Sequence, residues 1–334
     1  MTNELFALIK EYGSVSISGM CKNAGKTTTL NTLIKSIPDY ETPALSSIGR
    51  DGEKVDLVTG THKPGIFISK GTIIATAERL LKNCDITKEI LDTTGISTPM
   101  GEVIILRALS DGNVELAGPS IVSQLIEVSN TFRVFGADRI IIDGAVGRRS
   151  LCSRSLSEAV ILCTGASFSP VMEETVTETA HVCELLMTKS LPDEILCAPE
   201  SSLSALGLQN LSEASSNKPE SPLGAPESSL KENSGILHFE GAVTDNLLDP
   251  LIRSGKCNEL TIVAQDASKL LISINTLRRL KAVGAKLAVA QETHLAAITV
   301  NPFSAYGNHY NAAEFISKMQ AAASVPVINV SYIV

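Results

Sequence analysis

Residues 14–28 read Ser-Val-Ser-Ile-Ser-Gly-Met-Cys-Lys-Asn-Ala-Gly-Lys-Thr-Thr, and this stretch decides the fold. The β-branched run Ser14–Ser18 predicts a strand that ends at Gly19. The next segment, Gly25–Ser36, has helical spacing, with its large apolar residues on one face. The order strand, glycine loop, helix is typical of an anion site, because loop amides and the helix N-terminus point at the same place.

The loop matches most of the phosphate-binding pattern G-x-x-x-x-G-K-[ST]. Gly25-Lys26-Thr27 fits its end, whereas Met20 occupies the place of the first glycine and Gly19 lies one residue earlier. We expect the Lys26 ammonium to neutralise the β- and γ-phosphates of a nucleotide and the Thr27 hydroxyl to bind Mg²⁺. The nucleotide-binding residues predicted in this way are Gly19, Met20, Cys21, Lys22, Asn23, Ala24, Gly25, Lys26, Thr27 and Thr28.

A carboxylate at the end of a neighbouring buried strand usually completes a site for Mg²⁺ and nucleotide. The apolar run Arg139–Ile142 predicts such a strand and delivers Asp143 to its end. The glycines at 144 and 147 allow the backbone to approach a γ-phosphate closely. We therefore predict that Asp143 is a metal ligand and, with Lys26, a catalytic residue; a turn or helix-capping aspartate is the alternative.

Three further residues have alternatives that the sequence leaves open. Asp51 follows the second predicted strand in a Gly-rich loop, where it would act catalytically by binding Mg²⁺ or orienting a water, but a turn aspartate fits equally. Lys22 lies one place beyond the position where one subfamily of phosphate-loop ATPases carries a second lysine, so a solvated loop lysine fits as well. Lys63 could contact an anionic ligand or be solvated.

Apolar strands alternate with helices along the chain, which predicts an α/β fold with a mainly parallel sheet and flanking helices. We expect a nucleotide-binding domain at 1–197, a flexible Ser/Pro/Glu-rich linker at 198–234 and a C-terminal α/β unit at 235–334. This last unit could share the sheet or be separate. Two local patterns predict a helix at Ala75–Lys82 and a hairpin turn at Ser110–Asn113.

Composition limits the classes of function. The 334 residues carry a net charge of -8, 4% aromatic residues and no Trp, which argues against nucleic-acid and anionic-membrane partners. No apolar run approaches the ~20 residues that a membrane helix needs. The seven cysteines form no CxxC pair, which predicts free thiols in a reducing compartment. We expect a cytoplasmic protein.

The sequence indicates the base of the nucleotide less clearly than it indicates the phosphates. A guanine-reading Asn-Lys-x-Asp motif is expected after a strand, and the nearest match, Asn217–Glu220, falls within the predicted linker. We therefore favour ATP as the nucleotide. Asn301-Pro302, after the apolar strand Ile298–Val300, is a further candidate for contact with a base or a substrate.

Residues 14–28 and 139–147 resemble the P-loop fold that includes dethiobiotin synthetase. In that family an acidic residue at a strand end precedes Gly-Ala-Gly-Gly, as Asp143 here precedes Gly-Ala-Val-Gly, and a Lys-Pro follows the second strand, as Lys63-Pro64 does here. The resemblance implies an ATP-dependent ligase or small-molecule kinase.

Most of the chain outside the linker resembles a clostridial-type group of P-loop proteins found with adenosylcobalamin-dependent lysine and ornithine aminomutases. The matching stretches are Ser16–Leu30, Ile48–Glu53, Gly101–Ser120, Gly136–Ser150 and Ile298–Pro302. Members are regarded as one subunit of a reactivase that exchanges damaged cofactor for fresh cofactor. The resemblance implies ATP-driven switching and, as partner, an enzyme or a second reactivase subunit.

Three functions are therefore compatible with the sequence. The first is an ATPase that uses Mg²⁺ and ATP to remodel a partner enzyme. The second is the ligase or kinase, and the third is a nucleotide sensor without catalysis. A homo-oligomer is open in all three.

Overall fold

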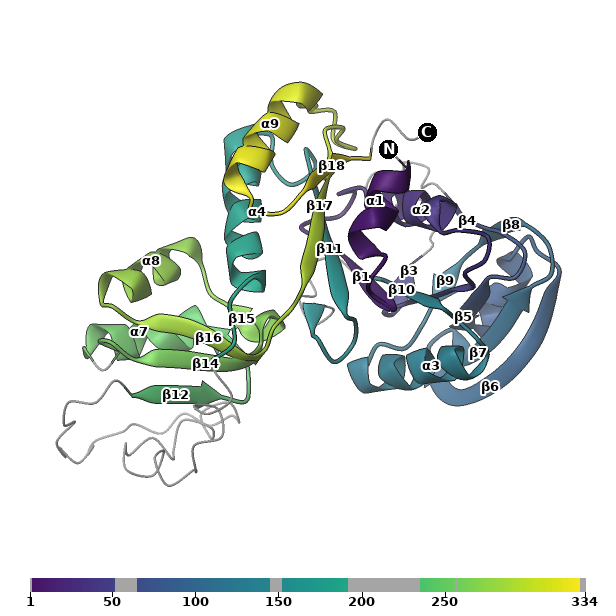
Figure 1. The fold of residues 1–334 in the computed structure, drawn as a ribbon, viewed down its shortest axis with the longest axis horizontal. Coiled ribbons are helices and arrows are strands. Elements are labelled where there is room, and N and C mark those ends of the chain that lie inside the picture. The colour runs from purple at the N-terminus through teal and green to yellow at the C-terminus, as the bar shows by residue number, and fades with distance from the viewer. Residues whose placement is uncertain (1, 52–64, 145–151, 192–234, 256, 331–334) are drawn as a thin grey trace. The chain divides into compact units, whose positions relative to one another are not determined.

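The computed structural model describes residues 2–51, 65–144, 152–191, 235–255 and 257–330. The predicted linker at 198–234 lies outside these ranges. The chain forms two compact units, of which unit 1 comprises residues 1–187 and 293–334 and unit 2 comprises residues 188–292 (Figure 1).

Unit 1 contains a nine-stranded sheet. Its strands, in spatial order, are β18 (Val327–Asn329), β17 (Leu295–Asn301), β11 (Ala159–Gly165), β1 (Ser14–Gly19), β10 (Arg139–Asp143), β2 (Pro43–Ser47), β5 (Ile73–Ala77), β7 (Gly101–Ala108) and β6 (Lys88–Thr98). The seven strands from β18 to β5 are parallel, and β7 runs antiparallel to both β5 and β6. The predicted mainly parallel sheet is confirmed.

Strand β1 lies between β10 and β11, in the middle of the parallel part. Ile17 pairs with Asp143 of β10, and Gly19 pairs with Cys163 of β11. Asp143 in turn pairs with Ser47 of β2. Because the strands are parallel, these carboxyl ends form one edge of the sheet, where open α/β sheets bind ligands.

Helices cover both faces of this sheet, as the sequence predicted (Figure 1). Helices α1 (Thr2–Ile9) and α2 (Lys26–Ser36) share one apolar core with Ile17 of β1 and Ile141 of β10. Helix α3 (Val122–Val134) packs in a second core on the opposite face, against Ile140 and Ile142. The remaining helices of unit 1, which pack on each other, are α4 (Met172–Leu186) and α9 (Ala312–Ala322).

Two small antiparallel pairs accompany the sheet. Strand β3 (Arg50–Asp51) pairs with β9 (Leu116–Ala117), and β4 (Ile66–Ile68) pairs with β8 (Gly112–Val114). The hairpin predicted at residues 110–113 is therefore wrong, because β8 pairs with β4 instead of β7. A Cβ atom on Gly112 would lie 1.9 Å from the Asp85 carbonyl oxygen, so this glycine serves close packing.

The helix predicted at Ala75–Lys82 is also wrong in its first part. Residues 73–77 form the fully buried strand β5, and only Glu78–Asn83 is helical, as the 3₁₀ helix η1. Burial on both faces of a central strand explains the difference, since it produces an apolar run without an alternating pattern.

Unit 2 is a small parallel α/β unit. Its main sheet has the order β12 (Ile236–Phe239), β14 (Thr261–Asp266) and β16 (Lys286–Gln291), and a parallel pair joins β13 (Val243–Thr244) and β15 (Leu270–Leu271). Helices α7 (Asp245–Arg253) and α8 (Ile274–Ala282) contact each other, and the 3₁₀ helix η4 spans Ala267–Lys269.

The boundaries of the units differ from those expected from the sequence. Residues 293–334, placed by the sequence in the C-terminal unit, contribute β17, α9 and β18 to unit 1. Local alternation predicts that a strand exists but not which sheet it joins, and this explains the difference. Unit 2 is thus an insertion between α4 and β17.

Candidate functional site

The loop between β1 and α2 is shaped by two residues with positive φ. Asn23 has φ 58° and Gly25 has φ 91°, and α2 begins at the next residue, Lys26. The first ladder bond runs from the Thr29 amide to the Gly25 carbonyl, at 2.8 Å. Gly25 offers no side-chain cap, so the helix presents its first amides without the usual acceptor at that position. Such a turn is suited to an anion.

Lys26 is folded back over the end of β1. A Cβ atom built on Gly19 would lie 2.9 Å from Cδ and 3.1 Å from Nζ of Lys26. Gly19 therefore leaves room for the lysine, even though it lies one residue before the usual first glycine. The ammonium reaches across the loop from the first residue of the helix.

The Asp143 carboxylate lies at the same sheet edge, on the face that α2 covers. Side chains alternate along a strand, and Ile141, two residues earlier, belongs to the core beneath α2. Asp143 is only 2% exposed. Ser47 of β2 shares this face, because Leu45 belongs to the same core. The strand order and register therefore place Asp143 at the sheet edge where β1 leads into the loop.

A buried polar cluster lies beneath the loop. The Thr29 hydroxyl is 2.9 Å from the Thr299 hydroxyl, and the Cys163 thiol contacts Thr29 at 3.5 Å. Burial raises the pKa of Cys163, while Lys26 lowers it and Asp143 raises it. The charges of Lys26 and Asp143 therefore act on this buried thiol in opposite directions.

Asn301, at the end of β17, supports the loop from the other side. Its Nδ2 donates to the Asn23 carbonyl at 3.3 Å, and its Cβ would lie 3.2 Å from a Cβ atom on Gly25. The sequence indicated Asn301 as a candidate for contact with a base or a substrate, not as a support of the loop. Its supporting position depends on β17 joining the large sheet, which the sequence did not predict.

The segment 118–120 joins the site edge, although the sequence assigned it no role. The Gly118 amide donates to the Gly49 carbonyl at 3.0 Å, and the Gly49 amide donates to the Pro119 carbonyl at 2.9 Å. A Cβ atom on Gly118 would lie 2.1 Å from the Ser47 carbonyl oxygen. Since the Ile48 amide donates to the Asp143 carbonyl at 3.1 Å, the loop after β2 is tied to both neighbours.

Other predicted residues are less well placed. Lys22 is exposed on the loop. Asp51 ends β3 by its backbone, but its side chain is outside the described part, as is all of Lys63. The segment after Gly144, with the predicted glycine at 147, is outside it as well. In the ranges that the structure describes, no group of three or more His, Cys, Asp or Glu is placed to hold a metal ion.

The thiol of Cys21 is half-buried in the loop. Burial raises its pKa to about 11, while Lys26 lowers it and Cys163 raises it. At neutral pH it is therefore a neutral thiol, which adds no negative charge to the loop.

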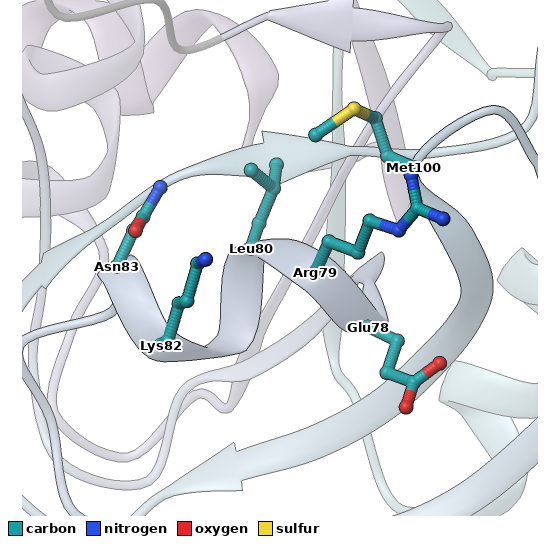
Figure 2. A pocket seen from close by; sticks show the side chains of 6 residues that line it. All are labelled: Glu78, Arg79, Leu80, Lys82, Asn83 and Met100. Atoms are coloured by element: carbon teal, nitrogen blue, oxygen red, sulfur yellow. The ribbon is translucent and has the colours of Figure 1, made fainter.

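A separate pocket lies beside η1, after the carboxyl end of β5. It is lined by Glu78, Arg79, Leu80, Lys82, Asn83 and Met100, with Met100 reaching it from the β6–β7 turn (Figure 2). Three strand spacings, about 14 Å, separate β5 from β1 in the sheet. The pocket is therefore not part of the phosphate loop.

Comparison with protein-family models, curated proteins and solved structures found no match to this chain. No helix in the described ranges is long and apolar enough to cross a membrane.

Proposed function

We propose that this protein is a P-loop ATPase that binds Mg²⁺ and ATP at residues 19–28. The observation that carries the proposal is the position of Lys26. Its ammonium folds over Gly19 at the end of β1, and the neighbouring strand β10 carries Asp143 to the same sheet edge. A cation, helix amides and a carboxylate at one sheet edge are the groups that phosphoryl transfer requires.

Each residue has a distinct role in this proposal. The amides of the loop and of the first turn of α2 bind phosphate oxygens, and Lys26 neutralises the β- and γ-phosphates. The Asn23 Nδ2 is buried and has no hydrogen-bond partner among the described residues, so a donor is available within the loop itself. Thr27 and Asp143 would hold Mg²⁺, which supplies charge neutralisation between the β- and γ-phosphates when bound.

We further propose that hydrolysis is coupled to the remodelling of a partner enzyme. Support comes from the loop after β2, which is bonded on one side to Asp143 and on the other to residues 118–119. A segment held by backbone bonds at the site edge can transmit a change at the γ-phosphate to the surface. The resemblance to aminomutase reactivases points to a cobalamin-dependent enzyme as the partner.

The experiment that tests the proposal compares Lys26→Ala with Lys22→Ala. We expect Lys26→Ala to lose Mg-ATP binding and turnover, measured by calorimetry and phosphate release. Lys22→Ala, which changes an exposed lysine of the same loop, should keep more than about a tenth of both. No ATP binding by the wild-type protein would reject the proposal, and turnover unaffected by any candidate partner would reject the coupling.

A second candidate is the ligase or small-molecule kinase, whose substrate would have to extend about 14 Å from the pocket beside η1 to the phosphate loop. This pocket opens at the carboxyl edge of the sheet and carries both charges of an ionic substrate site, Glu78 and Arg79. Phosphate release stimulated by a small carboxylic acid or amine in the absence of any partner, and lost in Arg79→Ala, would support this candidate. No stimulation across a metabolite panel would reject it.

A further inference from the structure

The loop after β17, residues 302–310, presents two exposed aromatic rings at the sheet edge that also carries the phosphate loop. Phe303 is 53% exposed and Tyr306 is 56% exposed. The loop follows Asn301, whose Nδ2 donates to the Asn23 carbonyl at 3.3 Å. It is therefore continuous with the support of the proposed phosphate site.

Hydrogen bonds inside the loop fix its backbone. The Asn301 Oδ1 accepts from the Phe303 amide at 3.1 Å, and the Ser304 hydroxyl accepts from the Tyr306 amide at 3.1 Å. The Ser304 amide donates to Nδ1 of His309 at 3.2 Å, and the His309 ring lies edge-on to Phe303, with the centroids 5.5 Å apart. An exposed aromatic ring held in this way loses little conformational entropy when a ligand stacks on it.

A second loop, residues 166–171, holds the first one in place. The Asn308 Nδ2 donates to the Ala166 carbonyl at 2.7 Å, and the Tyr310 hydroxyl donates to the Ser169 carbonyl. Val171, at the end of this second loop, is 54% exposed. Two mutually bonded loops at one sheet edge thus expose large apolar side chains, and their polar groups are used to fix the loops themselves.

We propose that Phe303 and Tyr306 form a stacking platform for the base of the nucleotide whose phosphates bind at residues 19–28. The inference rests on the proposed function. Aromatic rings suit a nucleotide base because every base offers a π-face, and each stacked ring strengthens binding by roughly five- to 150-fold. The ligand class is a purine nucleoside triphosphate, bound through its base as well as its phosphates.

The test compares two ligands, Mg-ATP and Mg-tripolyphosphate, on the full-length chain. Tripolyphosphate carries the phosphates without the base. We expect Phe303→Ala and Tyr306→Ala to weaken ATP at least fivefold each and to leave tripolyphosphate within about twofold, measured by calorimetry. Tyr306→Phe keeps a ring and should bind ATP like the wild type. Tyr40→Ala removes a ring that is 83% exposed in the connection from α2 to β2, far from this loop in sequence, and is the matched control.

The outcomes separate this inference from the proposed function. Equal weakening of ATP and tripolyphosphate would overturn the inference, because the loop would then act only through Asn301 and the phosphate site. Unchanged ATP binding in both alanine variants would also overturn it. If neither ligand binds the wild type, the proposed function fails first. Circular dichroism of each variant checks that the fold is retained.

Discussion

The position of Asp143 in the fold limits what its carboxylate can contact. The residue lies at the end of the strand next to β1, faces α2 and is 2% exposed. A carboxylate in that position interacts strongly with nearby charges, because water screens it little.

We expect Asp143→Asn to weaken Mg²⁺ binding and to lower the turnover of ATP, each by more than about tenfold, because the amide is a weaker metal ligand. The measurement is phosphate release against Mg²⁺ concentration. Glu115→Gln is the matched control, since Glu115 is also buried but is hydrogen-bonded to Asn83 at 2.9 Å. Equal losses in both variants would show a general effect of removing a buried charge.

Cys21 gives a prediction that depends on pH. Since burial raises its pKa from 9.0 to about 11, the reactive thiolate is scarce at neutral pH and grows about tenfold per pH unit until the pH approaches 11. An ordinary thiol would stop gaining reactivity near pH 9. Mass spectrometry after timed iodoacetamide treatment from pH 7 to 10 measures the rate at Cys21. A rate that levels off between pH 9 and 10, as for an ordinary thiol, would contradict the raised pKa of Cys21.

At the scale of elements, Arg139 joins the start of β10 to α1 and to the connection before β2. Its guanidinium contacts both oxygens of Glu41, at 3.0 and 2.9 Å, and donates to the carbonyls of Ile9, Lys10 and Tyr12. Only 6% of its side chain is exposed. The phosphate loop lies at the opposite end of β1, so this network fixes the strand that carries the loop.

We expect Arg139→Ala to lower the free energy of unfolding by about 3–5 kcal/mol, because it leaves the Glu41 charge and the helix-end carbonyls without their partner. Urea denaturation followed by circular dichroism measures the loss. Arg133→Ala is the control, since its 3.7 Å pair with Glu158 is exposed and should contribute less than about 1 kcal/mol. Similar values for the two arginines would contradict this account.

The individual elements show which parts of the fold can be predicted from the sequence. The pattern of residues 14–28 predicted β1, its loop and α2, because strand, punctuation and helix are all local signals. The apolar run at 139–142 likewise predicted β10 and the position of Asp143. The role of Gly118 and the support from Asn301 depend on long-range packing, which leaves no periodic pattern in the sequence.

On the scale of the whole molecule, the segments by which the chain enters and leaves unit 2 lie side by side. The Val289 amide donates to the Lys189 carbonyl at 3.1 Å, and Ser190 bridges to Val289. Glu292 accepts from the Ser190 amide at 2.9 Å and pairs with Lys189 at 3.1 Å. The pKa of Glu292 is lowered, chiefly by the hydrogen bond from the Ser190 amide. The two connections are therefore held together within the insertion itself.

We expect a chain in which residues 190–290 are replaced by a short glycine linker to keep the fold and nucleotide binding of unit 1, because an insertion with adjacent ends adds little closure entropy. Circular dichroism and calorimetry with Mg-ATP measure this. A chain that lacks residues 293–334 is the contrasting variant, since it removes β17 and β18 from the sheet. If excision of the insertion abolished cooperative unfolding, the division into units would be wrong.

The late position of Asn301 in the chain has a consequence for synthesis. The phosphate loop is synthesised well before Asn301, which follows 276 residues after Gly25 (301 − 25), a delay of roughly 14–55 s at cellular elongation rates. Until then the loop has no contact from β17. We expect stalled nascent chains that end before residue 293 not to retain ATP, and full-length released chains to retain it. The ability to bind nucleotide would thereby report that β17 has been synthesised and has joined the sheet.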